Sequence, residues 1–161
     1  MNYDHIIFLD FDGVLATDDY DDILMERNDS LRDFFGRKFD PNCVASLKMI
    51  IESTNADIVI TSSWRHYLNP FSMRFMWRLR KMPGRVIGLT PSMSDNRSLE
   101  IESWLSKHPE IVNYVILDDM DKRQFESRQH THLVTCNHLS GLSMQDAQKA
   151  LLILKGITSL S

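Results

Sequence analysis

Long hydrophobic runs are absent from the 161-residue sequence. None approaches the roughly 20 residues that a membrane-spanning helix needs, so we expect no membrane partner. Cysteine is scarce: Cys43 and Cys136 form neither a CxxC pair nor a disulfide framework, which favours reduced thiols and a cytoplasmic location. Residues 1–13 contain no Lys or Arg, unlike the start of a secretory signal. The net charge of −4 argues against a generally basic nucleic-acid-binding protein but permits a local basic face.

Internal repeats, low-complexity tracts and Gly/Ser linkers are also missing, so we expect residues 1–161 to form a single domain. Short runs rich in Ile, Val and Leu recur along the chain. These runs are Ile6–Phe11, Asp57–Thr61, Val86–Thr90, Tyr114–Leu117 and His132–Cys136. Continuous apolar runs of this kind predict strands that are buried on both faces, as in a parallel sheet.

Helix signals separate the runs. Asp40–Pro41 and Asn69–Pro70 each offer an N-cap with proline at the first helical position. Asp95 or Asn96 can cap a third helix, and Ser143 can cap the last one. This alternation predicts an α/β fold, a three-layer Rossmann-like sandwich around a mainly parallel five-stranded sheet. Functional residues in such sheets gather at the carboxyl ends of the strands.

Paired carboxylates follow two of the predicted strands. Asp10 and Asp12 lie at the end of the first run, where alternation sends both to the same side of the chain. Asp118 and Asp119 follow the fourth run. Four acids at one sheet edge repel each other unless they share a cation, and carboxylate oxygens suit Mg²⁺. The sequence therefore predicts a Mg²⁺ site.

Smaller residues complete this candidate site. Gly13 permits a tight exit from the first strand. Thr61 and Ser62 place hydroxyls after the second strand, where they suit the oxygens of a phosphate. We therefore expect a phosphorylated substrate.

These residues, in this order, resemble the haloacid-dehalogenase-like (HAD) phosphohydrolases. Asp10–Leu15, with the sequence DFDGVL, matches the first motif of that family. Thr61–Ser62 matches the second motif, and Asp118–Asp119 matches the fourth in its double-aspartate form. The resemblance implies a HAD-like fold without a large cap domain.

The chain is most similar to the small HAD domains associated with RNA-repair (Swiss Army Knife) proteins. The similarity covers nearly the whole chain except residues 17–38. The segments that carry it are Ser62–Arg65, Gly88–Pro91, Arg97–Leu105 and Gly141–Ser143.

The resemblance implies a Mg²⁺-dependent phosphatase that acts through an aspartyl-phosphate. Asp10 would be the nucleophile, and Asp12 would protonate the leaving oxygen and then activate water. Mg²⁺ would be held by Asp10, the backbone carbonyl of Asp12 and Asp119, with Asp118 as an indirect ligand. Thr61 would bind a phosphate oxygen.

A cation is still needed beside the phosphate, and most relatives use a lysine there. Arg97 is the best positional match, and Arg65, which follows the second motif, is its competitor. Arg65 and Ser62 are also predicted substrate contacts, together with Gly13.

Two segments of the sequence are candidates for selecting the substrate. Residues 17–38 are expected to form a short flap or loop, with the acidic run at 18–22 as a solvated loop. Residues 64–85 contain six Lys or Arg side chains, interleaved aromatics and no Asp or Glu. We favour packing of Phe71, Phe75 and Leu79 on the sheet; the alternative is a surface that binds a nucleic-acid backbone and stacks a base.

The expected substrate is a nucleic-acid terminal phosphate or a nucleotide. The alternatives are a phosphatase of small phosphomonoesters, a non-catalytic HAD-like binding module, a response-regulator receiver and a metal-dependent nuclease. A zinc site of His130, His132, Cys136 and His138 is a further alternative, although these residues are more simply explained as edge-strand or loop residues.

Overall fold

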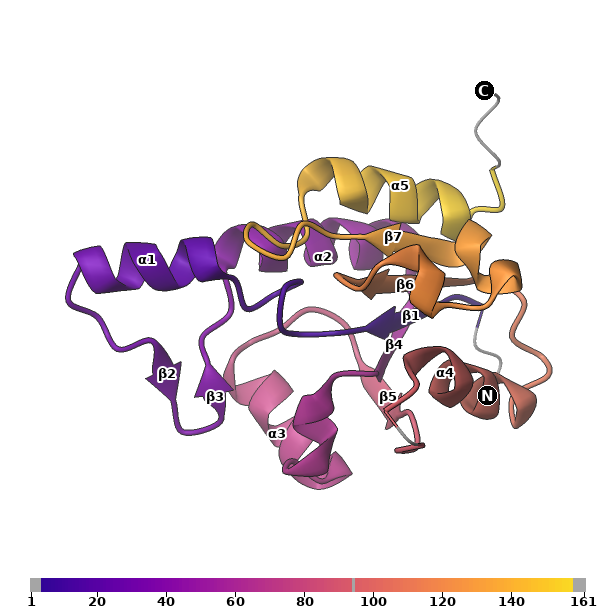
Figure 1. Cartoon of the computed structure of the whole chain (residues 1–161), viewed down its shortest axis with the longest axis horizontal. Helices are drawn as coiled ribbons and strands as arrows, with labels where there is room; N and C mark the ends of the chain where they lie inside the picture. Colours follow the sequence, from indigo (N-terminus) through magenta and orange to yellow (C-terminus); the bar gives the residue numbers. More distant parts are fainter. Residues whose placement is uncertain (1–3, 94, 158–161) are drawn as a thin grey trace.

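A five-stranded parallel sheet forms the centre of the protein (Figure 1). The computed structural model describes residues 4–93 and 95–157. The strands are β1 (Ile6–Leu9), β4 (Asp57–Ile60), β5 (Val86–Leu89), β6 (Tyr114–Asp118) and β7 (Leu133–Thr135). All five predicted strands are therefore confirmed, mostly with shorter bounds.

The order of the strands in the sheet is β5-β4-β1-β6-β7. Counted within this sheet alone, the order is third, second, first, fourth and fifth. A response-regulator receiver has the order 2-1-3-4-5. The topology therefore excludes the receiver alternative, and it places β1 between β4 and β6.

The four predicted helices are present, and side chains cap them as expected. They are α2 (Pro41–Thr54), α3 (Pro70–Leu79), α4 (Arg97–Ser106) and α5 (Met144–Leu154). Asp40, Asn69 and Ser143 accept a backbone N–H at the start of α2, α3 and α5. Asn96, rather than Asp95, caps α4. Three short 3₁₀ helices are η1 (Ser63–His66), η2 (Lys122–Gln124) and η3 (Ser127–His132).

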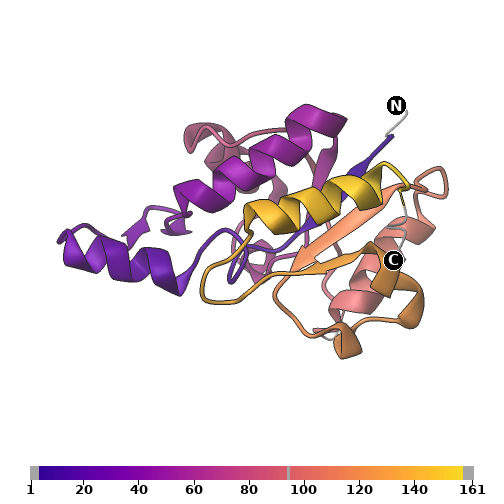
Figure 2. The same cartoon turned by 90° about the horizontal axis from the view of Figure 1, so that it is seen from above.

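Helices cover both faces of the sheet. In Figure 2, α2 and α5 lie side by side over one face, where Ile7 and Leu9 of β1 are buried in the larger core. Ile6 and Phe8 point to the other face, where the Phe8 ring meets Trp104 of α4 edge-to-face at a centroid distance of 5.4 Å. Because both faces of β1 are covered, a continuous apolar run is what this strand requires.

Residues 17–38 contain more regular structure than a flap or loop. They form helix α1 (Asp18–Glu26) and a two-stranded hairpin of β2 (Arg32–Asp33) and β3 (Gly36–Arg37), which extend from the carboxyl edge of the sheet (Figure 1). The acidic run is helical because Thr17 accepts the N–H of Tyr20 and acids in a first turn favour the helix dipole. Asp18, Asp19 and Asp22 are exposed to solvent as expected, but the run is a helix rather than the expected loop.

Arg80, the C-cap residue of α3, attaches the hairpin to the main body. Its guanidinium donates to both carboxylate oxygens of Asp33 at 2.9 and 2.7 Å, and to the carbonyls of Gly36 and Arg37. The Arg80 guanidinium also lies 4.4 Å from the centroid of the Phe39 ring. The hairpin is therefore held in a defined position beside the sheet edge.

Helix α3 turns a different face to the core from the one we favoured. Met73, Met76 and Trp77 are buried, whereas Phe71 and Phe75 are exposed by 78% and 49%. The favoured packing of the two phenylalanines on the sheet was therefore wrong. Both faces of this helix carry apolar residues at helical spacing, so periodicity alone does not select between them.

Both cysteines are free and buried. None of the helices among the described residues combines the length and apolar character that a membrane span requires.

Candidate active site

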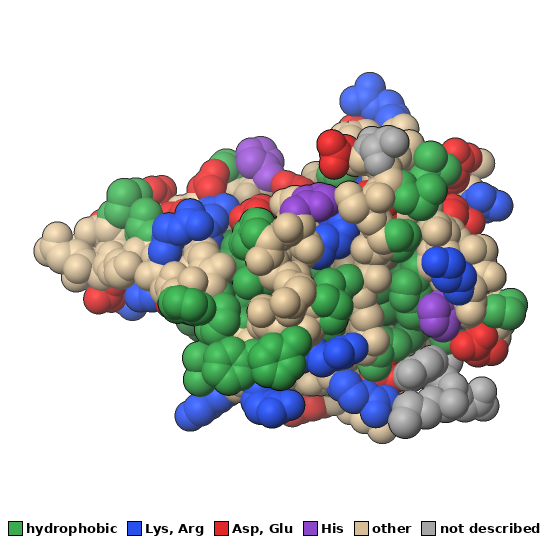
Figure 3. Space-filling model, turned by 90° about the horizontal axis from the view of Figure 1, so that it is seen from below, with side chains coloured by type: hydrophobic (Ala, Val, Ile, Leu, Met, Phe, Trp, Pro, Cys, Tyr) green, Lys and Arg blue, Asp and Glu red, His purple; other side chains and the backbone are tan. Residues whose placement is uncertain are grey.

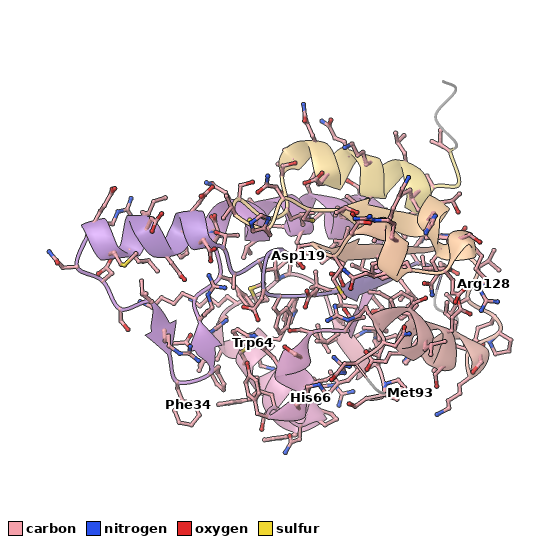
Figure 4. The ribbon with its side chains drawn as sticks, in the orientation of Figure 1. Phe34, Trp64, His66, Met93, Asp119 and Arg128 are labelled. Atoms are coloured by element: carbon pink, nitrogen blue, oxygen red, sulfur yellow. The ribbon has the colours of Figure 1, made fainter. Side chains whose placement is uncertain are left out.

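Neighbouring strands bring three carboxylates together at the carboxyl edge of the sheet. Asp10 follows β1, and its N–H donates to the carbonyl of Leu117 in β6 at 3.1 Å. Asp118 ends β6 and Asp119 follows it. One carboxylate oxygen from each of Asp10, Asp118 and Asp119 lies within 4.8 Å of the others. Figure 4 shows Asp119 at this edge.

The donor set fits Mg²⁺, which prefers oxygen ligands and is commonly bound through carboxylates. Burial raises the pKa of Asp10 above its ordinary value, and Arg97 opposes this effect. Burial, together with the neighbouring Asp10, raises the pKa of Asp118 to about 7. Three crowded carboxylates, two of them buried, are stabilised by an added positive charge. The predicted ligands Asp10, Asp118 and Asp119 are thus brought together.

Arg97 supplies a fixed positive charge to this cluster. Its Nη1 lies 2.5 Å from Oδ2 of Asp118, 3.5 Å from Oδ2 of Asp10 and 3.3 Å from Oγ1 of Thr61. Burial acts to lower the pKa of Arg97, but Asp118 and Asp10 raise it above its ordinary value. The guanidinium therefore stays charged, and it touches both the carboxylates and the second-motif hydroxyl.

Arg65 has different partners. Its Nη2 lies 2.6 Å from Oε2 of Glu100, and both side chains are almost fully buried. Its Nη1 donates to the backbone carbonyls of Thr61 and Ser62. The geometry therefore places Arg97, rather than Arg65, against the carboxylates and Thr61, while Arg65 holds the backbone of the second motif.

Thr61 and Ser62 differ in what their hydroxyls do. The Thr61 N–H donates to the carbonyl of Leu9, which fixes the residue next to Asp10, and its Oγ1 faces Arg97. Oγ of Ser62 accepts the N–H of Trp64 and caps η1. Both residues are buried, and Thr61 is the better placed of the two to meet a phosphate oxygen.

Asp12 is held by two residues that the sequence reasoning did not assign to the site. The indole Nε1 of Trp64 donates to Oδ2 of Asp12 at 2.9 Å, and Nη1 of Arg37 donates to Oδ1 at 3.2 Å. Trp64 lies inside the matching segment Ser62–Arg65, which was a usable signal. Arg37 lies in the 17–38 insertion, which the resemblance leaves out, so the sequence offered no signal for it.

The histidines and the cysteine of the alternative zinc site do not form a metal site. The ring of His130 bonds to the carbonyl of Phe125, and the ring of His132 bonds to the carbonyl of Tyr114 and stacks on that tyrosine. Cys136 is buried. Among the residues that the structure describes, the aspartate cluster is the one group of three or more that fits a metal ion. The simpler account of these histidines is therefore supported.

A cavity of about 700 Å³ lies beside the start of α4. Its lining is mostly polar and comprises Asp95, Asn96, Arg97, Ser98, Met120, Arg123, Gln124, Phe125, Glu126, Ser127 and His130. Arg97 joins this cavity to the carboxylate cluster, although the three aspartates do not line it.

The family described as the HAD domain in Swiss Army Knife RNA repair proteins matches residues 6–147. Neither the curated proteins nor the solved structures contain a significant match. The matched range includes every aspartate of the cluster, Asp12, the second motif and Arg97. Because the match covers most of the sequence, the chain belongs to the family of HAD domains in Swiss Army Knife RNA repair proteins.

Proposed function

We propose that this protein is a Mg²⁺-dependent phosphohydrolase that acts through an aspartyl-phosphate. The observation that carries the proposal is the cluster of Asp10, Asp118 and Asp119 with the Arg97 guanidinium, all at the carboxyl edge of the central strands. A nucleophilic carboxylate, metal ligands and a fixed cation are the groups that phosphoryl transfer needs. Membership of a HAD family supports the same chemistry.

In the first step, a carboxylate oxygen of Asp10 attacks the phosphorus of the substrate. The new oxygen–phosphorus bond forms while the bond to the leaving oxygen breaks. The leaving oxygen keeps the electron pair and takes a proton from the carboxyl group of Asp12. The alcohol departs, and the phosphoryl group stays on Asp10.

In the second step, Asp12 is a carboxylate and removes a proton from water. The water oxygen attacks phosphorus, and the bond to Asp10 breaks. Inorganic phosphate is released, Asp10 returns to its carboxylate form and Asp12 is protonated again. Asp10, the backbone carbonyl of Asp12 and Asp119 would hold Mg²⁺, with Asp118 as an indirect ligand, and the bound ion would neutralise phosphate charge. Arg97, which donates to Oγ1 of Thr61, balances the remaining negative charge of the phosphoryl group.

We propose a nucleic-acid terminal phosphate as the substrate. An exposed aromatic surface, defined here as Phe34, Tyr67, Phe71 and Phe75, extends from the insertion hairpin across η1 and α3. The rings of Phe71 and Phe75 are parallel with centroids 6.5 Å apart, and Phe35 lies 6.0 Å from Phe75. Figure 3 shows hydrophobic side chains gathered on this face and bordered by Lys and Arg side chains.

This aromatic surface begins next to the proposed general acid. Burial and the nearby charge of Asp12 raise the pKa of the Tyr67 hydroxyl to about 12. The surrounding segment, residues 64–85, carries no acidic residue, and Arg78 and Lys81 are exposed there. Exposed rings stack unpaired bases and cations contact the phosphate backbone, so the surface suits a single strand whose end reaches Asp10.

The experiment that tests this proposal measures phosphate release with and without Mg²⁺. The panel holds oligonucleotides with 3′- or 5′-phosphates, nucleotides, sugar phosphates and phosphopeptides. Release that needs Mg²⁺ and is lost in Asp10→Asn supports the phosphatase, and release from an oligonucleotide end supports the substrate. Release from small esters alone would overturn the substrate and keep the chemistry. No release from any ester by the folded protein would favour a binding module.

A further inference from the structure

We infer that Arg37 and Trp64 are positioning residues that fix the carboxyl group of Asp12 toward the leaving oxygen. The inference deepens the proposed function and rests on it. It gives the 17–38 insertion a definite role in the reaction, because Arg37 belongs to its hairpin.

The side chain of Asp12 needs such support. It is 45% exposed, and it lies in the turn after β1 rather than inside a strand or helix. Trp64 donates to one of its oxygens and Arg37 to the other. Two donors from different elements restrict the rotation of this carboxyl group, and restricted orientation is what a proton donor needs.

Arg37 is itself held from the side away from Asp12. Its Nη2 donates to Asp18 at 3.0 Å and to Asp21 at 2.8 Å, and its Nε donates to Asp21 at 3.2 Å. Both acids belong to α1. Helix α1 therefore sets the direction of the guanidinium, and the Nη1 atom of Arg37 is left to donate to Asp12.

Trp64 is fixed by the same hairpin. The ring is buried, and it meets Phe11 edge-to-face with centroids 5.2 Å apart. Gly36 has a φ of +140°, and a Cβ at this position would lie 2.9 Å from Cη2 of Trp64. Gly36 thus lets the hairpin backbone approach the indole, and the next residue, Arg37, reaches Asp12. In Figure 4, Trp64 lies at the carboxyl edge of the sheet and Phe34 at the tip of the hairpin.

The orientation suits both steps of the proposed reaction. When Asp12 is a carboxylate, both oxygens accept hydrogen bonds. When Oδ1 carries the proton, Oδ2 still accepts the indole N–H. The Trp64 contact therefore persists while Asp12 gives up and regains its proton.

The test uses leaving groups that differ in their need for a proton. p-Nitrophenolate leaves without protonation, whereas the terminal hydroxyl of a nucleotide leaves poorly without it. Arg37→Gln should lower the single-turnover rate of alcohol release from a 3′-phosphorylated oligonucleotide by about tenfold or more and change the single-turnover rate of p-nitrophenolate release by less than about threefold. Single-turnover rates are compared because the second step, in which Asp12 activates water, is the same for both esters. Asp12→Asn should show the same selectivity in the first step. The double variant Asp12→Asn with Arg37→Gln should react only slightly more slowly in that step than Asp12→Asn alone. Arg27→Gln, which removes the same charge from the end of α1, is the matched control.

A second readout does not depend on turnover. The indole N–H resonance of Trp64, identified through Trp64→Phe, should move in Arg37→Gln because the carboxylate that it contacts is no longer held. It should stay in place in Arg27→Gln. Equal loss of the first-step rate for both esters, or an unmoved indole resonance, would overturn the inference. If the wild-type protein hydrolyses neither ester, the proposed function fails, and the indole resonance alone decides whether Arg37 positions Asp12.

Discussion

Gly13 leaves the space that the side chain of Asp119 occupies. A Cβ on residue 13 would lie 2.9 Å from the Cβ of Asp119 and closer still to its carboxylate, and Gly13 has a φ of +77°. The first and fourth motifs are therefore in direct contact, and only glycine satisfies both the backbone conformation and the approach.

Gly13→Ala should displace the Asp119 carboxylate and weaken Mg²⁺ binding. The positive φ should also destabilise the fold by about 1 kcal/mol. We expect the increase in Tm on addition of Mg²⁺ to be lost, as measured by thermal unfolding with and without the metal. Gly156→Ala is the matched control, because Gly156 also has a positive φ of +66° but no atom lies within 4 Å of the added Cβ. An intact Mg²⁺ effect in Gly13→Ala would refute Asp119 as a ligand.

Arg97 and Arg65 should respond differently to substitution. Arg97→Ala should lower kcat about 100-fold or more, because it removes the cation that faces Thr61, Asp10 and Asp118. Phosphate release measured at saturating substrate checks this expectation.

Arg65→Ala should instead lower the free energy of unfolding by roughly 3–5 kcal/mol, because it leaves Glu100 buried without its partner. Denaturant unfolding measures this loss. Replacing both residues, in Arg65→Met with Glu100→Met, should recover much of the stability. A stable Arg65→Ala protein that lacks activity would reverse the assignment of the two arginines.

The metal-free protein should lose stability as the pH rises from about 4 to about 7. Burial raises the pKa of Asp118 from 3.8 to about 7, so between these values the folded state holds a proton that the unfolded chain has released. The free energy of unfolding therefore falls through this window and levels off above it. Denaturant unfolding across the range in EDTA provides the measurement. Asp118→Asn should flatten the curve, whereas Asp22→Asn, a change at an exposed acid, should not.

The aromatic surface should contribute to binding of single strands. Phe71→Ala and Phe75→Ala should each weaken binding of a fluorescent single-stranded oligonucleotide by about tenfold, since stacking of a base on a ring is worth roughly 1–3 kcal/mol. Fluorescence anisotropy in Mg²⁺-free buffer separates binding from turnover. Leu152→Ala, on α5, is the control for loss of an exposed apolar side chain. Equal affinity in all three variants would remove the aromatic surface from the substrate proposal.

Local sequence patterns account for the strands, the capped helices and the placement of the aspartates at one edge of the sheet. Each strand is a short apolar run, and the caps at Asp40, Asn69 and Ser143 are local in sequence. Parallel strands end at a shared edge, so Asp10 and Asp118 lie at the same edge of the sheet. Their direct proximity also needs the pairing of β1 with β6. These features follow from local pattern and from the direction of the strands.

The buried face of α3, the partners of the two arginines and the contact of Arg37 with Asp12 depend on tertiary packing. Both faces of α3 carry apolar residues, and only packing placed Met73 inside and Phe71 outside. Arg97 and Arg65 each follow a strand in the sequence. In the fold, Arg65 pairs with the buried Glu100, whereas Arg97 pairs with Asp118. Arg37 reaches Asp12 across 25 positions of sequence, through a hairpin whose path no local pattern predicts. Such contacts depend on how separate elements pack, and that packing is the physical reason why they emerge only in the folded chain.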